Sequence, residues 1–224
     1  MNFANVKDIQ IPQGRAKQVK DAQGNVLWSV VPKEYQLLQY IQSSGTQYID
    51  TGIAINYATQ KIEQRAIAQY TTSSSSRELM GANGYGFWGK NASDKLESAV
   101  GTAAGTITES ALVKNSVSLT TNPQGNAVLF TVNDNQYSAT ASTLANNNYA
   151  VYIFAIGGRS GAAASFFSKA KVYEYEILIN DESVAHLVPV KRRSDGVLGM
   201  FDLVNRQFRT NAGTGTFTAG TPLG

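Results

Sequence analysis

The strictest constraint in this sequence is an alternation with a period of two toward its C-terminal end. From Tyr173 onward every odd position up to Ile179 is apolar, while Glu174 and Glu176 fall between them. Successive side chains of a β-strand point to opposite faces, so the pattern predicts a strand with one buried and one solvated face. The buried face is expected to carry Tyr173, Tyr175, Ile177 and Ile179.

Three more strands are expected within the roughly fifty residues that end at Phe217. The turns are expected at 180–183, 194–196 and 205–206, and the strands at 184–190, 197–204 and 207–209. Pro189 lacks a backbone N–H, which favours an edge or strand-end position for the first of these strands. Strands joined by such short polar turns predict an antiparallel sheet.

The middle of the chain is organised in the same way. Further strands are expected at 47–51, 60–70, 95–100, 106–108, 113–120, 126–132, 136–140 and 149–156. No segment of ten residues shows a period of 3.6, so the fold class is all-β, and the length suits a single sandwich. The expected core residues are Tyr48, Ile62, Val128, Phe130, Tyr152, Phe154, Tyr173, Tyr175, Ile177, Met200 and Phe208.

Composition narrows the function classes. The chain has no Cys, which excludes a disulfide framework and Cys–His catalysis, and its single His excludes zinc sites built from several histidines. The N-terminus lacks the pattern of a secretory signal, and no apolar run approaches the roughly 20 residues of a membrane span. The net charge of +3 is scattered, with its densest cluster at 191–193. Nucleic-acid binders usually show a wider basic stripe, so no nucleic-acid partner and no membrane insertion are expected.

Two stretches resemble the ends of one known module. YIQSSGTQYIDTG, at 40–52, is similar to the opening motif of laminin-G-like, concanavalin A-like jelly-roll modules. LVPVKRRSDGVLGMFDLVNRQFRTNAGTGTF, at 187–217, resembles their closing motif. Such modules are common in structural proteins of phages and prophages of gut bacteria. The resemblance covers roughly 35–220 and implies an antiparallel jelly-roll β-sandwich of the lectin-like kind.

Residues 1–31 do not follow the pattern of the sandwich. They predict a small N-terminal β-hairpin or meander, which is too small to be stable without a partner. We expect it to anchor the 35–220 domain to other virion proteins or to sister chains, although a hairpin that merely extends the sandwich is the alternative. The expected anchoring residues are Ile9, Ile11, Val26, Leu27 and Trp28.

A glycine-rich aromatic stretch at 81–89 is the predicted ligand site. Tyr85 and Trp88 lie among four glycines, which leave ring faces uncrowded for a sugar to stack on. The loop at 157–161 contributes Arg159 to the same prediction. The alternative is that the aromatic side chains belong to the core.

Catalysis and metal binding are the alternatives to a ligand-binding site. Glu174 and Glu176 share a strand face, with Cα atoms roughly 7 Å apart, so a polysaccharide-cleaving glycoside hydrolase is the enzymatic alternative. His186 is expected to be a satisfied or half-exposed strand residue, so no catalytic residue is assigned. The aspartates at 50, 181, 195 and 202 do not form the dense acidic loop that calcium needs, so no metal and no cofactor are assigned.

The sequence therefore predicts a non-enzymatic phage virion structural protein. A head fibre, a decoration protein and a tail receptor-binding protein all fit. We expect a homo-oligomer, made in the host cytoplasm and assembled into the virion, that displays its sandwich for attachment to a surface or to a cell-surface glycan. A cellular lectin-like adhesin is the remaining alternative.

Overall fold

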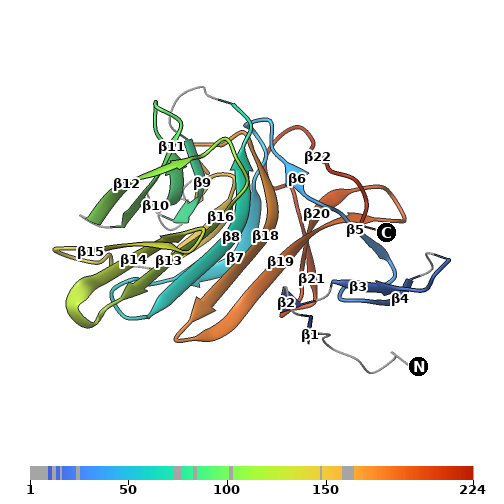
Figure 1. Ribbon diagram of the computed structural model, residues 1–224, viewed down its shortest axis with the longest axis horizontal. Helices are drawn as coiled ribbons and strands as arrows, with labels where there is room; N and C mark the ends of the chain where they lie inside the picture. The colour runs from blue at the N-terminus through green and yellow to red at the C-terminus, as the bar shows by residue number, and fades with distance from the viewer. Residues whose placement is uncertain are drawn as a thin grey trace.

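In a computed structural model of the chain, the described residues are 10–11, 14–15, 17–23, 26–72, 77–82, 85–100, 103–146, 148–157 and 164–223. Two sheets face each other as a sandwich, and the N-terminal strands lie to one side of it (Figure 1). The predicted all-β, antiparallel jelly-roll class is confirmed. Among the described residues, no helix is both long enough and apolar enough to span a membrane.

The larger sheet has eleven strands, and eight of them follow the order β15-β14-β13-β8-β18-β19-β20-β21. The strands are β5 (Tyr35–Leu37), β6 (Ile41–Gln42), β8 (Ile62–Tyr70), β13 (Asn115–Asn122), β14 (Ala127–Val132), β15 (Asn135–Thr140), β18 (Ala170–Ile179), β19 (Glu182–Arg192), β20 (Leu198–Asp202), β21 (Gln207–Thr210) and β22 (Thr218–Ala219). A single 3-10 turn at Gln124–Asn126 joins β13 to β14. Short connections join β13 to β14, β14 to β15, and β18 through β21 in succession, which is why turn residues located these strands in the sequence.

The smaller sheet has seven strands in the order β12-β11-β10-β9-β16-β7, with β17 beside β9. The strands are β7 (Ile49–Ile55), β9 (Arg77–Ala82), β10 (Tyr85–Lys90), β11 (Lys95–Val100), β12 (Ala103–Ser110), β16 (Tyr149–Ile153) and β17 (Ile156–Gly157). The N-terminal element is two hairpins, β1 (Gln10–Ile11) with β2 (Gly14–Arg15) and β3 (Gln18–Lys20) with β4 (Val26–Ser29).

The main core lies between the two sheets. Seven of the predicted core residues are buried there: Ile62, Val128, Phe130, Phe154, Tyr175, Ile177 and Met200. Tyr48 and Tyr152 are only half-buried, and their rings pack against each other with centroids 4.8 Å apart. They alternate with the buried Ile49 and Ile153, so they lie on the outer face of the smaller sheet.

The prediction that Tyr173 lies in the core is wrong. A β-bulge breaks the register between β18 and β8 after Val172, which pairs with Ala68, while Glu174 pairs with Ile67. Because the bulge adds one residue to β18, Val172 and Tyr175 both face the core although they are three positions apart. Tyr173 is left half-buried on the outer face.

A second, smaller core covers the outer face of β19 and β20. Val188, Val190 and Phe201 form it together with Val31 and Leu37. Phe208, predicted for the main core, packs here instead and is half-buried. The stretch around the predicted 31/35 boundary therefore packs directly on the sandwich.

Two further expectations are corrected. Strand β19 is not an edge strand, because β18 and β20 flank it. Pro189 is accommodated where β18 stops pairing at Leu187 and β5 starts at Val190, so its missing N–H interrupts no ladder bond there. The predicted continuous strand at 149–156 is broken at Phe154, whose φ of 71° ends β16.

The two motifs that resemble the laminin-G-like module lie side by side. The Thr46 hydroxyl donates to the Thr214 carbonyl at 3.0 Å, and the Tyr48 N–H donates to the Asn211 side chain at 3.2 Å. Gly213 packs so closely that a Cβ there would lie 2.2 Å from the Thr46 carbonyl oxygen. These contacts close the ends of the domain onto each other.

Candidate functional site

The side chains of the predicted ligand-binding residues lie outside the described part of the structure. Tyr85 and Trp88 belong to β10, where their backbones pair with Ala82 and Met80 of β9, but their side chains are outside the described residues. Arg159 lies in the 158–163 stretch, which is also outside them. The role of these three residues in binding stays a prediction.

Three of the five expected anchoring residues lie in β4. Trp28 is buried at 7% exposure, whereas Val26 and Leu27, at 46% and 48%, point into solvent at the start of β4. The backbone of Ile11 pairs with Gly14 in the first hairpin, and Ile9 lies outside the described residues. Among the expected anchoring residues whose side chains the structure describes, Val26 and Leu27 therefore offer apolar surface to a partner, and Trp28 does not.

A groove of about 370 Å³ lies on the larger sheet and is a candidate site. Two rows of outward-facing residues run across β13, β14 and β15 and build it. The rows are Thr120, Leu129 and Ser138, and next to them Asn122, Ala127 and Thr140. Lys61 closes one end, and Val128 and Ala139 complete the lining.

The groove combines an apolar stripe with free polar groups. Ala127 and Leu129 supply the stripe, while Thr120, Ser138 and Thr140 carry hydroxyls that form no hydrogen bond to another described residue. The Asn122 carboxamide oxygen accepts from Gln124 N–H at 3.0 Å, which leaves its NH₂ group free to donate. Pockets that bind small molecules commonly combine apolar lining with a few placed polar groups.

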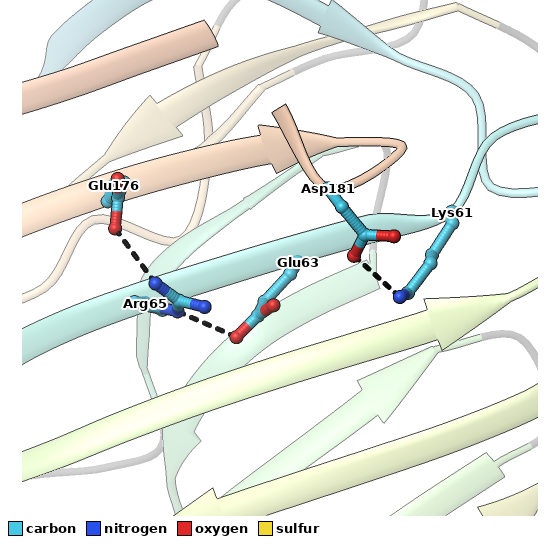
Figure 2. A network of polar contacts seen from close by, with 5 residues as sticks. All are labelled: Lys61, Glu63, Arg65, Glu176 and Asp181. Carbon is cyan, nitrogen blue, oxygen red and sulfur yellow. Dashed lines mark hydrogen bonds and ion pairs between the residues drawn. The ribbon is translucent and has the colours of Figure 1, made fainter. Parts of the chain in front are cut away.

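Charged residues form a network at the end of the groove where Lys61 lies (Figure 2). Arg65 bridges Glu63, at 2.7 Å, and Glu176 of the neighbouring strand, at 3.3 Å. The hydrogen bond to Glu63 is the main cause that raises the pKa of Arg65. Lys61 pairs with Asp181 at 2.6 Å. Each carboxylate is thus held by a cation.

Glu174, half of the carboxylate pair considered for hydrolysis, is also held by partners. It shares the outer face with Glu176, as predicted. In the strand register the two glutamates lie opposite Ile67 and Arg65, which are two positions apart on β8 and so point to the same face. Glu174 contacts His186 Nε2 at 2.7 Å and Lys17 Nζ at 2.5 Å. Burial raises its pKa, but the hydrogen bond with His186 and the charge and hydrogen bond of Lys17 outweigh burial and lower the pKa to about 2.

The pairing of Glu174 opposes a role in proton transfer. A general acid needs a raised pKa, and Glu174 has the reverse. Lys17 comes from the N-terminal element, so this ion pair also fastens that element to the sandwich. His186 is 15% exposed and satisfied by Glu174, as expected.

The remaining charged candidates have structural partners. Arg192 forms a two-point contact with Asp195 and lies over the Phe208 ring, and Arg193 donates to the Lys33 carbonyl. The aspartates considered for calcium lie in separate places, and no cluster of three potential metal ligands occurs among the described residues.

Sequence reasoning missed the groove. A signal was present, because Ser116, Ser118, Thr120 and Asn122 alternate with buried residues along β13. Such an outward polar row is common on any solvated sheet. It marks a site only when the register of β14 and β15 places an apolar stripe beside it.

No protein-family model matches the chain, and no curated protein matches it in sequence. Among solved structures, it is similar to a candidate carbohydrate-binding protein from Bacteroides ovatus, with a TM-score of 0.55 and 15% identity. The match covers 84% of this chain and 62% of the other. A sialidase of Trypanosoma rangeli, solved in complex with sialic acid, matches at a TM-score of 0.43 and 13% identity over 82% of this chain and 34% of the sialidase. The first likeness shows a shared sandwich fold, and the second is too distant to bear on this chain.

Proposed function

We propose that this sandwich is a non-enzymatic carbohydrate-binding module and that its ligand occupies the groove on β13, β14 and β15. The observation that carries the proposal is the arrangement of unpartnered hydroxyls on both sides of the Ala127–Leu129 stripe. A sugar ring has C–H faces and a rim of hydroxyls, so it can satisfy both kinds of surface at once. The volume of about 370 Å³ suits one or two sugar units.

The absence of catalysis is part of the proposal. None of the residues that line the groove is a carboxylate, and hydrolysis of a glycosidic bond ordinarily requires two. The nearby Glu63 and Glu176 are engaged by Arg65. The similarity in fold to the Bacteroides protein supports a binding role without supplying a ligand.

The test uses a panel of bacterial capsular and cell-wall glycans with matched double variants. Thr120→Val with Ser138→Ala removes two hydroxyls from the groove. Ser118→Ala with Thr131→Val removes the same two groups from the next pair of positions on the same face, outside the lining. Loss of two hydrogen bonds should weaken binding about tenfold in the first variant, and the second should match the parent chain. Equal affinity in all three proteins would contradict the groove, and no binding to any glycan would contradict the function.

The same incubations test the hydrolase alternative. We expect no new reducing ends. Sustained cleavage that is lost in both Glu174→Gln and Glu176→Gln would replace the binding module with an enzyme.

We further propose that the module is displayed on a virion and held there, as a homo-oligomer, through its N-terminal element. The resemblance at 40–52 and 187–217 and the exposed Val26 and Leu27 support this setting. Many copies would let weak single contacts add up by avidity. Replacing Val26 and Leu27 with Asp in the full chain should leave the fold intact and abolish assembly with the particle or with sister chains. Unchanged assembly would contradict the anchoring role.

A further inference from the structure

A second surface, on the same sheet but at the other end of β8, carries two lysines above two tyrosines. The bulge after Val172 turns Tyr173 outward, where its ring meets the ring of Tyr40 edge-on, with centroids 5.3 Å apart. Bulges recur where a strand re-aims a side chain for function. Eight residues separate Lys61, at the groove, from Gln69, beside Tyr173, which places this patch roughly 25 Å from the groove.

Each ring holds an ammonium group. Lys114 Nζ lies 4.5 Å from the centroid of the Tyr173 ring, and Lys171 Nζ lies 4.6 Å from that of Tyr40. Both distances are within the range of a cation–π contact. Such a contact uses one side of the ammonium group and leaves its other N–H bonds free to donate.

Neither lysine has an acidic partner. In the part of the chain that the structure describes, no ion pair joins Lys114 or Lys171 to a carboxylate. Glu174, the acid next to Tyr173 in sequence, is taken by Lys17 and His186. The patch therefore presents two uncompensated positive charges on a pre-arranged aromatic base.

The surroundings extend the patch along the sheet. Both ends of the Gln69 carboxamide are engaged, since its oxygen accepts from the Tyr173 hydroxyl and its NH₂ group donates to the Leu112 carbonyl. In the strand register, Lys171 lies opposite Gln42, and Gln42 lies opposite Thr218. An amide and a hydroxyl therefore continue the row beyond the lysine on the outer face. Neither side chain hydrogen-bonds to another described residue.

We propose that Lys114, Lys171, Tyr40 and Tyr173 form a second binding site, which takes the sulfate or carboxylate groups of an acidic polysaccharide. The two ammonium groups bind the anions, and Gln42 and Thr218 offer hydrogen bonds to adjoining sugar hydroxyls. A charged ligand is favoured over a neutral one because the ring faces are covered by the lysines. This site is independent of the groove and does not require it.

The test measures binding of the full chain to immobilised sulfated polysaccharide, polygalacturonate, neutral dextran and single-stranded DNA at low salt. The double variant Lys114→Ala with Lys171→Ala should lose at least tenfold in affinity for the acidic polymers. A charge-matched control, Lys20→Ala with Lys33→Ala, changes exposed lysines elsewhere and should lose less than twofold. The two acidic polymers distinguish sulfate from carboxylate, and dextran should not bind at this site.

Tyrosine variants separate a built site from net charge. Tyr173→Phe keeps the ring and should bind like the parent, whereas Tyr173→Leu removes the base under Lys114 and should bind several-fold more weakly. Far-ultraviolet circular dichroism checks that each variant is folded. Equal losses in the two lysine variants, an unchanged Lys114/Lys171 variant, or tighter binding to single-stranded DNA than to either acidic polymer would overturn the proposal.

Discussion

Replacing Glu174 with Gln should destabilise the protein in a way that depends on pH. Gln has the shape of a protonated Glu, so the variant mimics the neutral acid beside His186 and Lys17. The partners lower the pKa of Glu174 from its ordinary value of 4.5 to about 2. That shift corresponds to about 3 kcal/mol of stability in the ionised form.

The sign follows from the direction of the shift. A depressed carboxyl pKa gives stability that is complete above pH 4.5 and is lost as the pH falls toward 2. The gap in unfolding free energy between the parent and Glu174→Gln should therefore be about 3 kcal/mol at pH 6 and about 1 kcal/mol at pH 2.5.

Urea unfolding, followed by tryptophan fluorescence at both pH values, measures this gap. Glu182→Gln is the matched control, because Glu182 is exposed and contacts no charged group among the described residues; it should shift stability by less than about 0.5 kcal/mol. A gap of the same size at pH 6 and pH 2.5 would refute the reasoning, because the ion pairs would then not be its cause.

Two further predictions concern the core and the joined motifs. Gln64→Leu removes the acceptor of the buried Tyr175 hydroxyl, which donates to Gln64 at 2.5 Å, and should cost about 1–3 kcal/mol in urea unfolding; a cost near zero would contradict this. Gly213→Ala places a Cβ about 2.2 Å from the Thr46 carbonyl oxygen and should lower Tm by several degrees. Gly125→Asn is the control: its side chain meets open space at a φ of 74°, so Tm should be nearly unchanged.

Local signals predicted most of the strands. The hairpins at 133–134 and 180–181 are marked by Asn and Asp, which tolerate the positive φ values found there, and alternation on either side gave the strand bounds to within a few residues. Burial of Ile62, Phe130 and Tyr175 followed from the same alternation. Turns, strand bounds and the alternation of buried residues depend on residues close together in the sequence, so they can be predicted from it.

Features set by pairing between distant strands could not be predicted. The position of Tyr173 depends on how β18 registers with β8, about a hundred residues earlier, and nothing in the local sequence marks the bulge. Pro189 led to the prediction of an edge strand. The sequence of one strand does not show that its neighbour β18 stops pairing before Pro189 and that β5 starts pairing after it.

The candidate site likewise combines residues that the sequence identifies with contacts that only the fold brings together. The two glutamates were found from the sequence, but Lys17, the partner that lowers the pKa of Glu174, lies 157 positions away and belongs to a different element. The groove needs three strands in register before its apolar stripe and hydroxyls come together. Tyr85, Trp88 and Arg159 remain sequence predictions.

The most direct test of the central claim is to locate a bound glycan by NMR. Amide shifts of the isotopically labelled chain would be followed during titration with a glycan that binds in the panel. We predict that the largest changes fall on Thr120, Leu129 and Ser138, with little change at Ser118 and Thr131. Changes centred on β10 and the 157–161 loop, with none on β13–β15, would contradict the groove as the site of glycan binding.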